Sequence, residues 1–140
     1  MIVARPSIWR FVALLLVTFS LASPVMAEKK EKTPKFIEFS GIAFPIIENN
    51  VLKQYVFIRF RVDIKTDDTA RISKIYYARP FMRDTIIRAS YQVYLGVPSK
   101  TGALDRNKLN ALIKSAWRQY MDPKDMGQIV ILETRPGPLL

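Results

Sequence analysis

The sequence predicts an α+β domain with a small antiparallel or mixed sheet and two or three helices. The strand signals are Phe/Ile-rich or alternating runs, and the two first runs are separated by the turn-forming residues Glu48-Asn49-Asn50. The helical signals are apolar residues that recur every three to four positions. The predicted strands are residues 36–47, 51–65 and 128–133, and the predicted helices lie within residues 68–89 and 105–120.

The N-terminal segment, residues 1–27, resembles an export signal. Arg5 and Arg10 precede a largely apolar run of twelve residues, 11–22, and Val25-Met26-Ala27 has the small residues expected before a cleavage site. A membrane-spanning helix needs about 20 apolar residues, so a short uncleaved anchor is the alternative. We expect cleavage after Ala27, a periplasmic location, and a charged linker over residues 28–35. With an uncleaved N-terminus, the domain would be anchored to the inner membrane and face the periplasm.

The composition limits the kinds of partner and of catalytic or metal site that an exported chain of this sequence can have. Removal of residues 1–27 lowers the 22 Lys and Arg residues to 20 and leaves all 12 acidic residues, a net charge of +8. Such a charge suits anionic lipid, cell wall or an acidic protein surface, and an exported chain meets little nucleic acid. The alternative is a solvated surface without a binding role. The absence of cysteine and histidine excludes disulfides, a Ser-His-Asp triad and Cys/His zinc sites. Carboxylate-only chemistry, as in a small hydrolase, is the alternative that stays open, but the acidic residues are scattered, and we expect no catalysis, metal or cofactor.

The first strand pair is predicted to be an antiparallel hairpin. In residues 51–65, the apolar side chains Val56, Ile58, Phe60, Val62 and Ile64 alternate with polar or aromatic ones. In residues 36–47, strict alternation would leave both faces apolar, which predicts two-sided burial or a subunit contact. Gly41 and Pro45 indicate a bulge and an edge position. Self-association is therefore expected through the first strand, with these candidates: Phe36, Phe39, Ile42 and Phe44.

The remaining elements are predicted from residues that cap helices and residues that interrupt regular structure. Pro80 divides the first helical region into two pieces, residues 68–78 and 80–89, and residues 91–101 end as a loop. Asp105 is expected to cap a last helix, whose stripe is expected to be core: Leu109, Leu112, Ile113, Ala116, Trp117 and Tyr120. The domain is expected to span residues 36–134, and residues 135–140, with two prolines, to form a non-regular tail.

The order of these elements and two short motifs resemble the flagellar basal-body-associated FliL family. Residues 79–87, RPFMRDTII, are similar to the family's Arg/Met-Pro-X-Ile-Arg-Asp-Ala-Ile-Ile helix, and Thr101-Gly102 is similar to its helix entry. The resemblance implies a stomatin/prohibitin-like fold, ring formation and contact with flagellar stator units, without catalysis or cofactor. Residues 129–133 depart from the family's C-terminal aromatic pattern, and the N-terminus departs from its full membrane helix. Both departures favour a diverged soluble paralogue.

Basic side chains beside aromatic ones are the candidate partner-binding residues. They are Arg79 and Arg83 of the Arg-Pro motif, and Arg59 and Arg61 in the second strand; the acidic Asp84 of the same motif is a further candidate. There are two structural alternatives. Asp84 pairs locally with Arg88, and the strand face that carries Arg59 and Arg61 is covered by a helix that packs on their aliphatic stems. The expected function is a periplasmic accessory protein of the flagellar motor that self-associates and binds a stator or envelope protein. The alternative is a soluble periplasmic binding module for an anionic ligand or a cell-wall polymer.

Overall fold

The computed structural model describes residues 35–97 and 100–140, with the side chains of residues 100–102 excepted. They lie within the second of the chain's two units, Thr33–Leu140. The predicted signal and, apart from Lys35, the predicted linker fall outside the described residues. The elements are β1 (Phe36–Glu48), β2 (Val51–Ile64), α2 (Thr69–Ser90), β3 (Gly96–Val97), β4 (Lys100–Leu104), α3 (Arg106–Tyr120), a 3-10 turn η1 (Pro123–Asp125) and β5 (Met126–Leu139).

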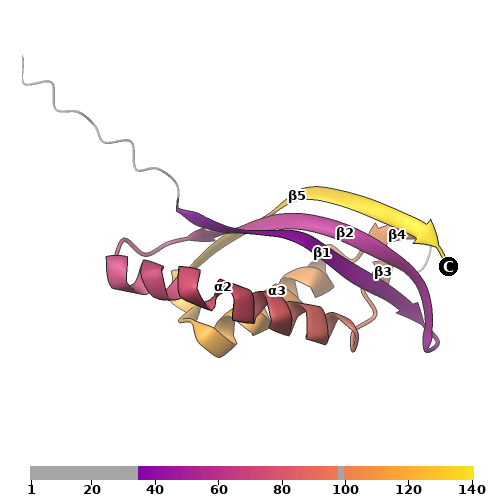
Figure 1. Ribbon diagram of the computed structural model, residues 1–140, viewed down its shortest axis with the longest axis horizontal. Helices are drawn as coiled ribbons and strands as arrows, with labels where there is room; N and C mark the ends of the chain where they lie inside the picture. Colours follow the sequence, from indigo (N-terminus) through magenta and orange to yellow (C-terminus); the bar gives the residue numbers. More distant parts are fainter. Residues whose placement is uncertain (1–34, 98–99) are drawn as a thin grey trace, which may run out of the picture. The chain divides into compact units, whose positions relative to one another are not determined.

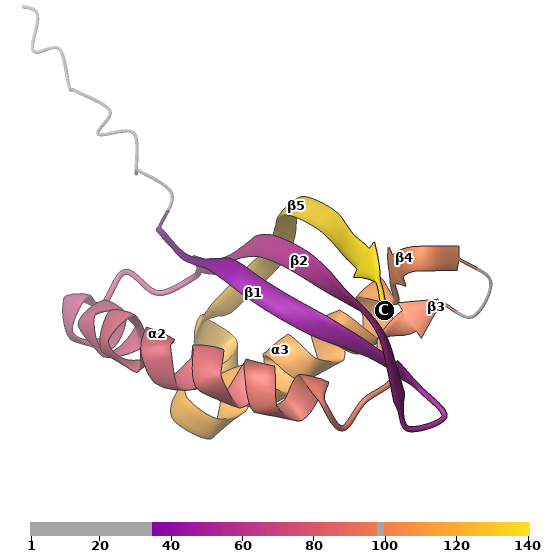
Figure 2. The same cartoon turned by 45° about the vertical axis from the view of Figure 1, so that its right-hand side comes forward.

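The domain has two layers, which confirms the predicted α+β class. An antiparallel sheet in the order β1-β2-β5 forms one layer, and α2 and α3 lie together on one face of it (Figure 1). The view in Figure 2 shows the same arrangement and the small β3–β4 hairpin beyond the end of the sheet. The core lies between the two layers, where inward side chains of β1 and β2 meet those of both helices.

The hairpin of β1 and β2 forms as predicted. Asn49 and Asn50 both have positive φ, 51° and 62°, which is the conformation of a two-residue turn that matches the twist of the strands. On β2, the alternating residues from Val56 to Ile64 are all buried, and Phe60 and Val62 are fully so. The predicted one-sided burial of this strand is therefore confirmed.

The prediction that β1 is apolar on both faces is wrong, and a bulge at Gly41 is the reason. Between the pairs Phe39–Phe60 and Ile42–Ile58, β1 advances three residues while β2 advances two. Gly41 adopts φ 64°, a conformation that glycine reaches at little cost. The extra residue shifts the alternation, so that the apolar side chains on both sides of the bulge point into the core: Ile37, Phe39, Ile42, Phe44 and Ile46.

The C-terminal strand is longer than predicted. Residues 135–139, expected to be a tail, continue β5 along β2 as far as the pair Gln54–Leu139. Pro136 and Pro138 are tolerated because β5 is an edge strand, where a missing N–H leaves no ladder bond unmade. Three register irregularities break the alternation of β5, and its side chains are half-buried or exposed rather than buried.

Helix α2 is continuous, so the predicted division at Pro80 is wrong. The helix runs from Thr69 to Ser90 with Pro80 inside it. Pro80 is on the exposed side of the helix, where water can hydrate the carbonyl that its ring leaves unpaired. The predicted cap forms: the Asp68 carboxylate accepts from the backbone N–H groups of Ala70 and Arg71 at 2.9 and 3.2 Å.

Helix α3 supplies the centre of the core. Asp105 caps it as predicted, and five of the six stripe residues, including Trp117 at 1% exposure, are buried, while Tyr120 is half-buried. The segment before α3 differs from the prediction. Instead of a loop and a helix entry at Thr101-Gly102, it forms the β3–β4 hairpin, because residues 100–104 pair back with residues 96–97.

Candidate binding surfaces

The outer face of the sheet holds two of the predicted partner-binding residues in local ion pairs. Arg59 lies 3.6 Å from Glu38 on β1 and 4.0 Å from Glu133 on β5, so one guanidinium links all three strands. Arg61 lies 3.3 Å from Asp63, and its guanidinium carbon is 5.2 Å from the centre of the Phe36 ring. Because each charge has a partner in the same sheet, this face has little unbalanced charge to offer a binding partner.

The predicted self-association residues are mostly inside the domain. Phe39, Ile42 and Phe44 are at most 2% exposed, and the rings of Phe39 and Phe60 stack at 4.9 Å. Phe36 is half-buried beneath Arg61. These side chains cannot contact a second subunit without leaving the core, so their assignment to a subunit interface is not supported. What remains for self-association is the backbone edge of a strand.

Side chains of α2 cover part of the β1 edge. Tyr76 donates its hydroxyl hydrogen to the carbonyl oxygen of Phe36 at 3.1 Å, and Arg83 donates to the carbonyl oxygen of Gly41 at 3.1 Å. Pro45 further along β1 has no N–H to offer a neighbouring strand. Edge strands that are capped or carry proline resist pairing with other chains. The edge of β1 from Phe36 to Pro45 is therefore a poor site for strand addition.

The Arg-Pro motif divides between two sides of α2. Arg83 faces β1 through its bond to Gly41, and Arg79 lies one turn earlier on that side and is exposed. Asp84 forms an ion pair with Arg88, the predicted local pair, and this hydrogen bond holds the pKa of Asp84 below its ordinary value. Asp84 therefore neutralises a cation of its own helix, and the motif is not one continuous patch.

The positive charge of the domain is concentrated in the helices. We call α2 and α3 together the helix layer. Helix α2 carries five Lys or Arg residues and a single acidic residue, and α3 carries four basic residues and no acidic one, a net charge of +8. The three long strands carry four basic and four acidic residues, a net charge of zero. An anionic partner is thus attracted to the helix layer rather than to the sheet.

An exposed aromatic strip crosses the helix layer. It consists of Tyr77 and Phe81 on α2, 76% and 50% exposed, and of half-buried Tyr120 on α3. The ring centres are 6.0 Å apart between Tyr77 and Phe81, and 6.4 Å apart between Phe81 and Tyr120. The Tyr120 hydroxyl is 2.7 Å from the Thr85 hydroxyl, which ties the strip to the next turn of α2.

A groove between α2 and α3 begins where the aromatic strip ends. This interhelix groove has a cavity volume of about 260 Å³ and a mostly apolar lining: Thr85, Ala89, Val93, Lys108, Ala111, Leu112, Ser115, Ala116 and Gln119. Neither the strip nor the groove was predicted from the sequence. Their signal was the four-residue spacing of positions 77, 81, 85 and 89, which places all four on one ridge of a helix.

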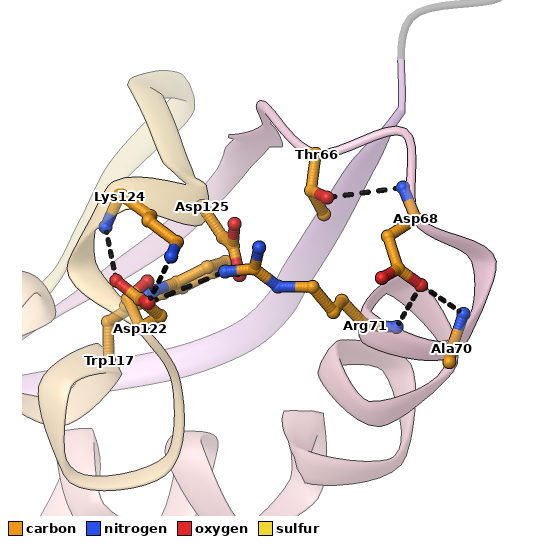
Figure 3. A network of polar contacts seen from close by, with 8 residues as sticks. All are labelled: Thr66, Asp68, Ala70, Arg71, Trp117, Asp122, Lys124 and Asp125. Carbon is orange, nitrogen blue, oxygen red and sulfur yellow. Dashed lines mark hydrogen bonds and ion pairs between the residues drawn. The ribbon is translucent and has the colours of Figure 1, made fainter.

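A polar network, also not predicted, fixes the end of α3 to the start of α2 (Figure 3). Arg71 lies 2.6 Å from Asp125, whose side chain is 7% exposed, and 3.4 Å from Asp122. The carbonyl of Asp122 accepts from the Trp117 indole N–H at 3.0 Å. The Asp122 carboxylate accepts from the Lys124 backbone N–H, and this bond lowers its pKa. These residues are distant in the sequence and hold one another in ion pairs and hydrogen bonds. We therefore assign this Arg71 network a structural role.

Two further features are absent from the part of the chain that the structure describes. None of the helices in residues 35–97 and 100–140 combines the length and the apolar character needed to cross a membrane. Within those same residues, no group of three or more carboxylate, histidine or cysteine side chains is placed to hold a metal ion. Comparisons of the chain with protein-family models, with curated proteins and with solved structures give no match.

Proposed function

We propose that this chain is a non-enzymatic periplasmic accessory protein of the flagellar basal body that acts by binding a stator or envelope protein. The observation that carries the proposal is the helix layer, which combines a net charge of +8 with an exposed aromatic strip and an apolar groove. Aromatic and arginine side chains are enriched in protein interfaces. The flagellar setting rests on the resemblance of residues 79–87 and of the element order.

The proposal includes a stomatin/prohibitin-like fold and assembly of several copies. The two-layer α+β architecture is compatible with that fold class. The position of the Arg-Pro motif within α2, between core and surface, also supports the assignment. Met82 and Ile86 of the motif enter the core, whereas Phe81 belongs to the aromatic strip and Arg83 caps β1. The same short motif therefore supplies side chains to the core and side chains to the surface. For this reason we connect the fold of the domain with its binding role.

The proposal is tested in a motile host by deleting the gene and measuring swimming in soft agar and in media of raised viscosity. We expect reduced swimming that the wild-type gene restores, and co-isolation of a stator or basal-body protein with the tagged chain. The control is Lys53→Glu, a substitution of an exposed residue on the sheet. It should leave the core unchanged and restore swimming fully. Normal swimming of the deletion strain, together with no motor protein among the proteins that co-isolate with the tagged chain, would contradict the flagellar role.

The second candidate is a periplasmic binding module for an anionic ligand or wall polymer. The surplus of cations on the helix layer favours it, because such a surface attracts any polyanion. A thermal-shift titration with anionic wall fragments separates the two. A raised melting temperature at stoichiometric amounts of fragment, absent with a neutral glycan, supports this candidate over the motor role.

A further inference from the structure

We propose that the interhelix groove binds an acidic amphipathic helix of a partner protein, with the aromatic strip as the continuation of the same contact. The inference rests on the proposed function only for its setting, since it concerns where the partner binds and by what chemistry. Three properties of the described surface identify the kind of partner: its shape, its apolar lining and its charge.

The shape of the groove suits a row of side chains. Its volume of about 260 Å³ is below the roughly 300 Å³ at which small-molecule pockets begin. Ala89, Ala111 and Ala116 lower its floor and walls, so a neighbouring backbone can approach closely. Side chains at four-residue spacing form ridges that fit grooves between helices. A helix with apolar residues at positions i, i+3, i+4 and i+7 presents such a ridge.

The aromatic strip lengthens the contact beyond the groove. Thr85 lines the groove and also contacts the Tyr120 hydroxyl, and Tyr120 stacks near Phe81. The contact between Thr85 and Tyr120 therefore joins the groove to the aromatic strip. The two form one continuous surface along α2, which we call the track. Exposed aromatic rings on a rigid helix lose little conformational freedom on binding and are frequent energetic centres of interfaces. The track thus has a recess for apolar side chains at one end and aromatic anchors at the other.

Charge complementarity selects an acidic occupant. Lys108 lines the groove itself, whereas Arg106, Lys114 and Arg118 line other recesses of α3 and add only to the general positive field of a helix that has no acidic residue. Asp105 precedes α3, and its carboxylate is engaged by the N–H groups of Asn107 and Lys108. A cationic peptide, or the helix layer of a second copy, would be repelled here. Acidic residues that flank the apolar ridge of a partner helix would be attracted.

A protein helix fits these observations better than an anionic membrane surface. Exposed aromatic and basic side chains also occur on membrane-surface helices. However, a flat lipid surface contacts convex parts of a protein and would leave the recess between α2 and α3 unfilled. The strip and the recess together are satisfied by an occupant with its own ridge of side chains.

The test uses the full-length chain in its native host with the photo-crosslinking residue p-benzoylphenylalanine. It is placed at Ala111, an exposed residue that lines the groove, and in the matched control at Phe57, 38% exposed on the sheet layer. Irradiated cells are analysed by mass spectrometry of the crosslinked peptides. We expect the Ala111 probe to crosslink to an acidic helical segment of another protein, and the Phe57 probe not to crosslink to it.

Variants sharpen the same measurement. Gln119→Trp is designed to fill the groove. Lys108→Glu combined with Arg118→Glu reverses the one cation in the groove lining and a second cation elsewhere on α3. We expect each to lower the crosslink yield at least tenfold while the melting temperature stays within a few degrees of wild type. The charge control on the sheet layer, Lys53→Glu with Arg135→Glu, should leave the yield unchanged. Crosslinks to lipid, to a second copy of this chain, to a basic segment or to nothing would each overturn the proposal.

The outcome separates this inference from the proposed function. An acidic helix from a protein outside the flagellar motor would support the groove and contradict the motor role. A swimming defect of the deletion strain without any specific groove crosslink would support the motor role and contradict the groove.

Discussion

The ion pair between Arg71 and Asp125 gives an asymmetric prediction. The Asp125 side chain is 7% exposed and that of Arg71 is 35% exposed, at an N–O distance of 2.6 Å. Replacing Arg71 by Met keeps the aliphatic stem but leaves a buried carboxylate without its partner. Replacing Asp125 by Asn removes the buried charge and leaves a guanidinium that reaches water and Asp122. Loss of the arginine should therefore cost more stability than loss of the carboxylate.

The magnitude follows from the burial of the pair. Exposed pairs contribute about 0.2–1 kcal/mol, whereas removing one partner of a fully buried pair costs about 3–5 kcal/mol. For this half-buried pair we expect Arg71→Met to lower the free energy of unfolding by about 2–3 kcal/mol, and Asp125→Asn by about 1 kcal/mol. At roughly 4–8 °C per kcal/mol for a domain near this size, the first variant should melt about 10 °C or more below wild type.

The assay is urea denaturation followed by circular dichroism for both single variants and the double variant. The double variant lacks the unpaired buried charge, so it should be more stable than the sum of the single effects, by about 1 kcal/mol. Additive effects, or an Asp125→Asn variant less stable than Arg71→Met, would refute the reasoning that burial of the carboxylate controls the cost.

Four further predictions concern other parts of the domain. Trp117→Ala should lower the free energy of unfolding by about 3–5 kcal/mol, and an unchanged urea midpoint would show that the indole is not core. Gly41→Ala should cost about 1–2 kcal/mol through its positive φ, since its Cβ meets nothing within 4 Å, and Gly41→Asn should cost less in the same assay. Arg79→Glu should leave the melting temperature unchanged, whereas Arg83→Glu loses the bond to β1 and should cost about 0.5–1.5 kcal/mol; equal melting temperatures would contradict this. The lowered pKa of Asp122 stabilises the fold above its ordinary value of 3.8, a contribution lost as pH falls through the folded-state pKa, so acid unfolding of Asp122→Asn should be less steep than that of wild type.

Local signals in the sequence were sufficient for most of the fold. The alternation of β2, the turn at Asn49-Asn50, the cap at Asp105 and the stripe around Trp117 each depend on neighbouring residues, and each is confirmed. The errors arose where a residue's effect depends on which side of an element faces water. Pro80 was expected to break a helix, at a cost of about 3 kcal/mol in a helix interior, yet buried residues before and after it, among them Ile75 and Met82, hold the whole helix against the core.

The same reasoning explains the error at the C-terminus. Pro136 and Pro138 were expected to prevent regular structure, but a strand at the edge of a sheet needs only half of its backbone groups for pairing. Whether a strand is at the edge is a property of the whole topology. The β3–β4 hairpin was missed for a different reason: its strands are too short to produce a recognisable pattern.

The candidate binding surface was less predictable than the fold. The sequence indicated Arg59 and Arg61. Glu38 and Glu133 on the neighbouring strands neutralise Arg59, which only the pairing register reveals, and Asp63 on the same strand neutralises Arg61. Arg79 and Arg83 were chosen as a motif, although one of them serves β1. The track of Tyr77, Phe81 and the groove depends on α2 and α3 being neighbours, which no local pattern specifies.

The extra residue at Gly41 gives β1 the equivalent of a reading frame. The segments before and after it are each in phase with the core only because of the bulge between them. Removal of a single residue near Gly41 would restore strict pairing but turn one segment inside out, exposing either Ile37 and Phe39 or Ile42 and Phe44. A compensating insertion elsewhere in β1 would return the displaced segment to its core-facing alternation. The residues between the deletion and the insertion would remain reversed. The length of this strand is therefore under tighter constraint than the identity of any of its side chains.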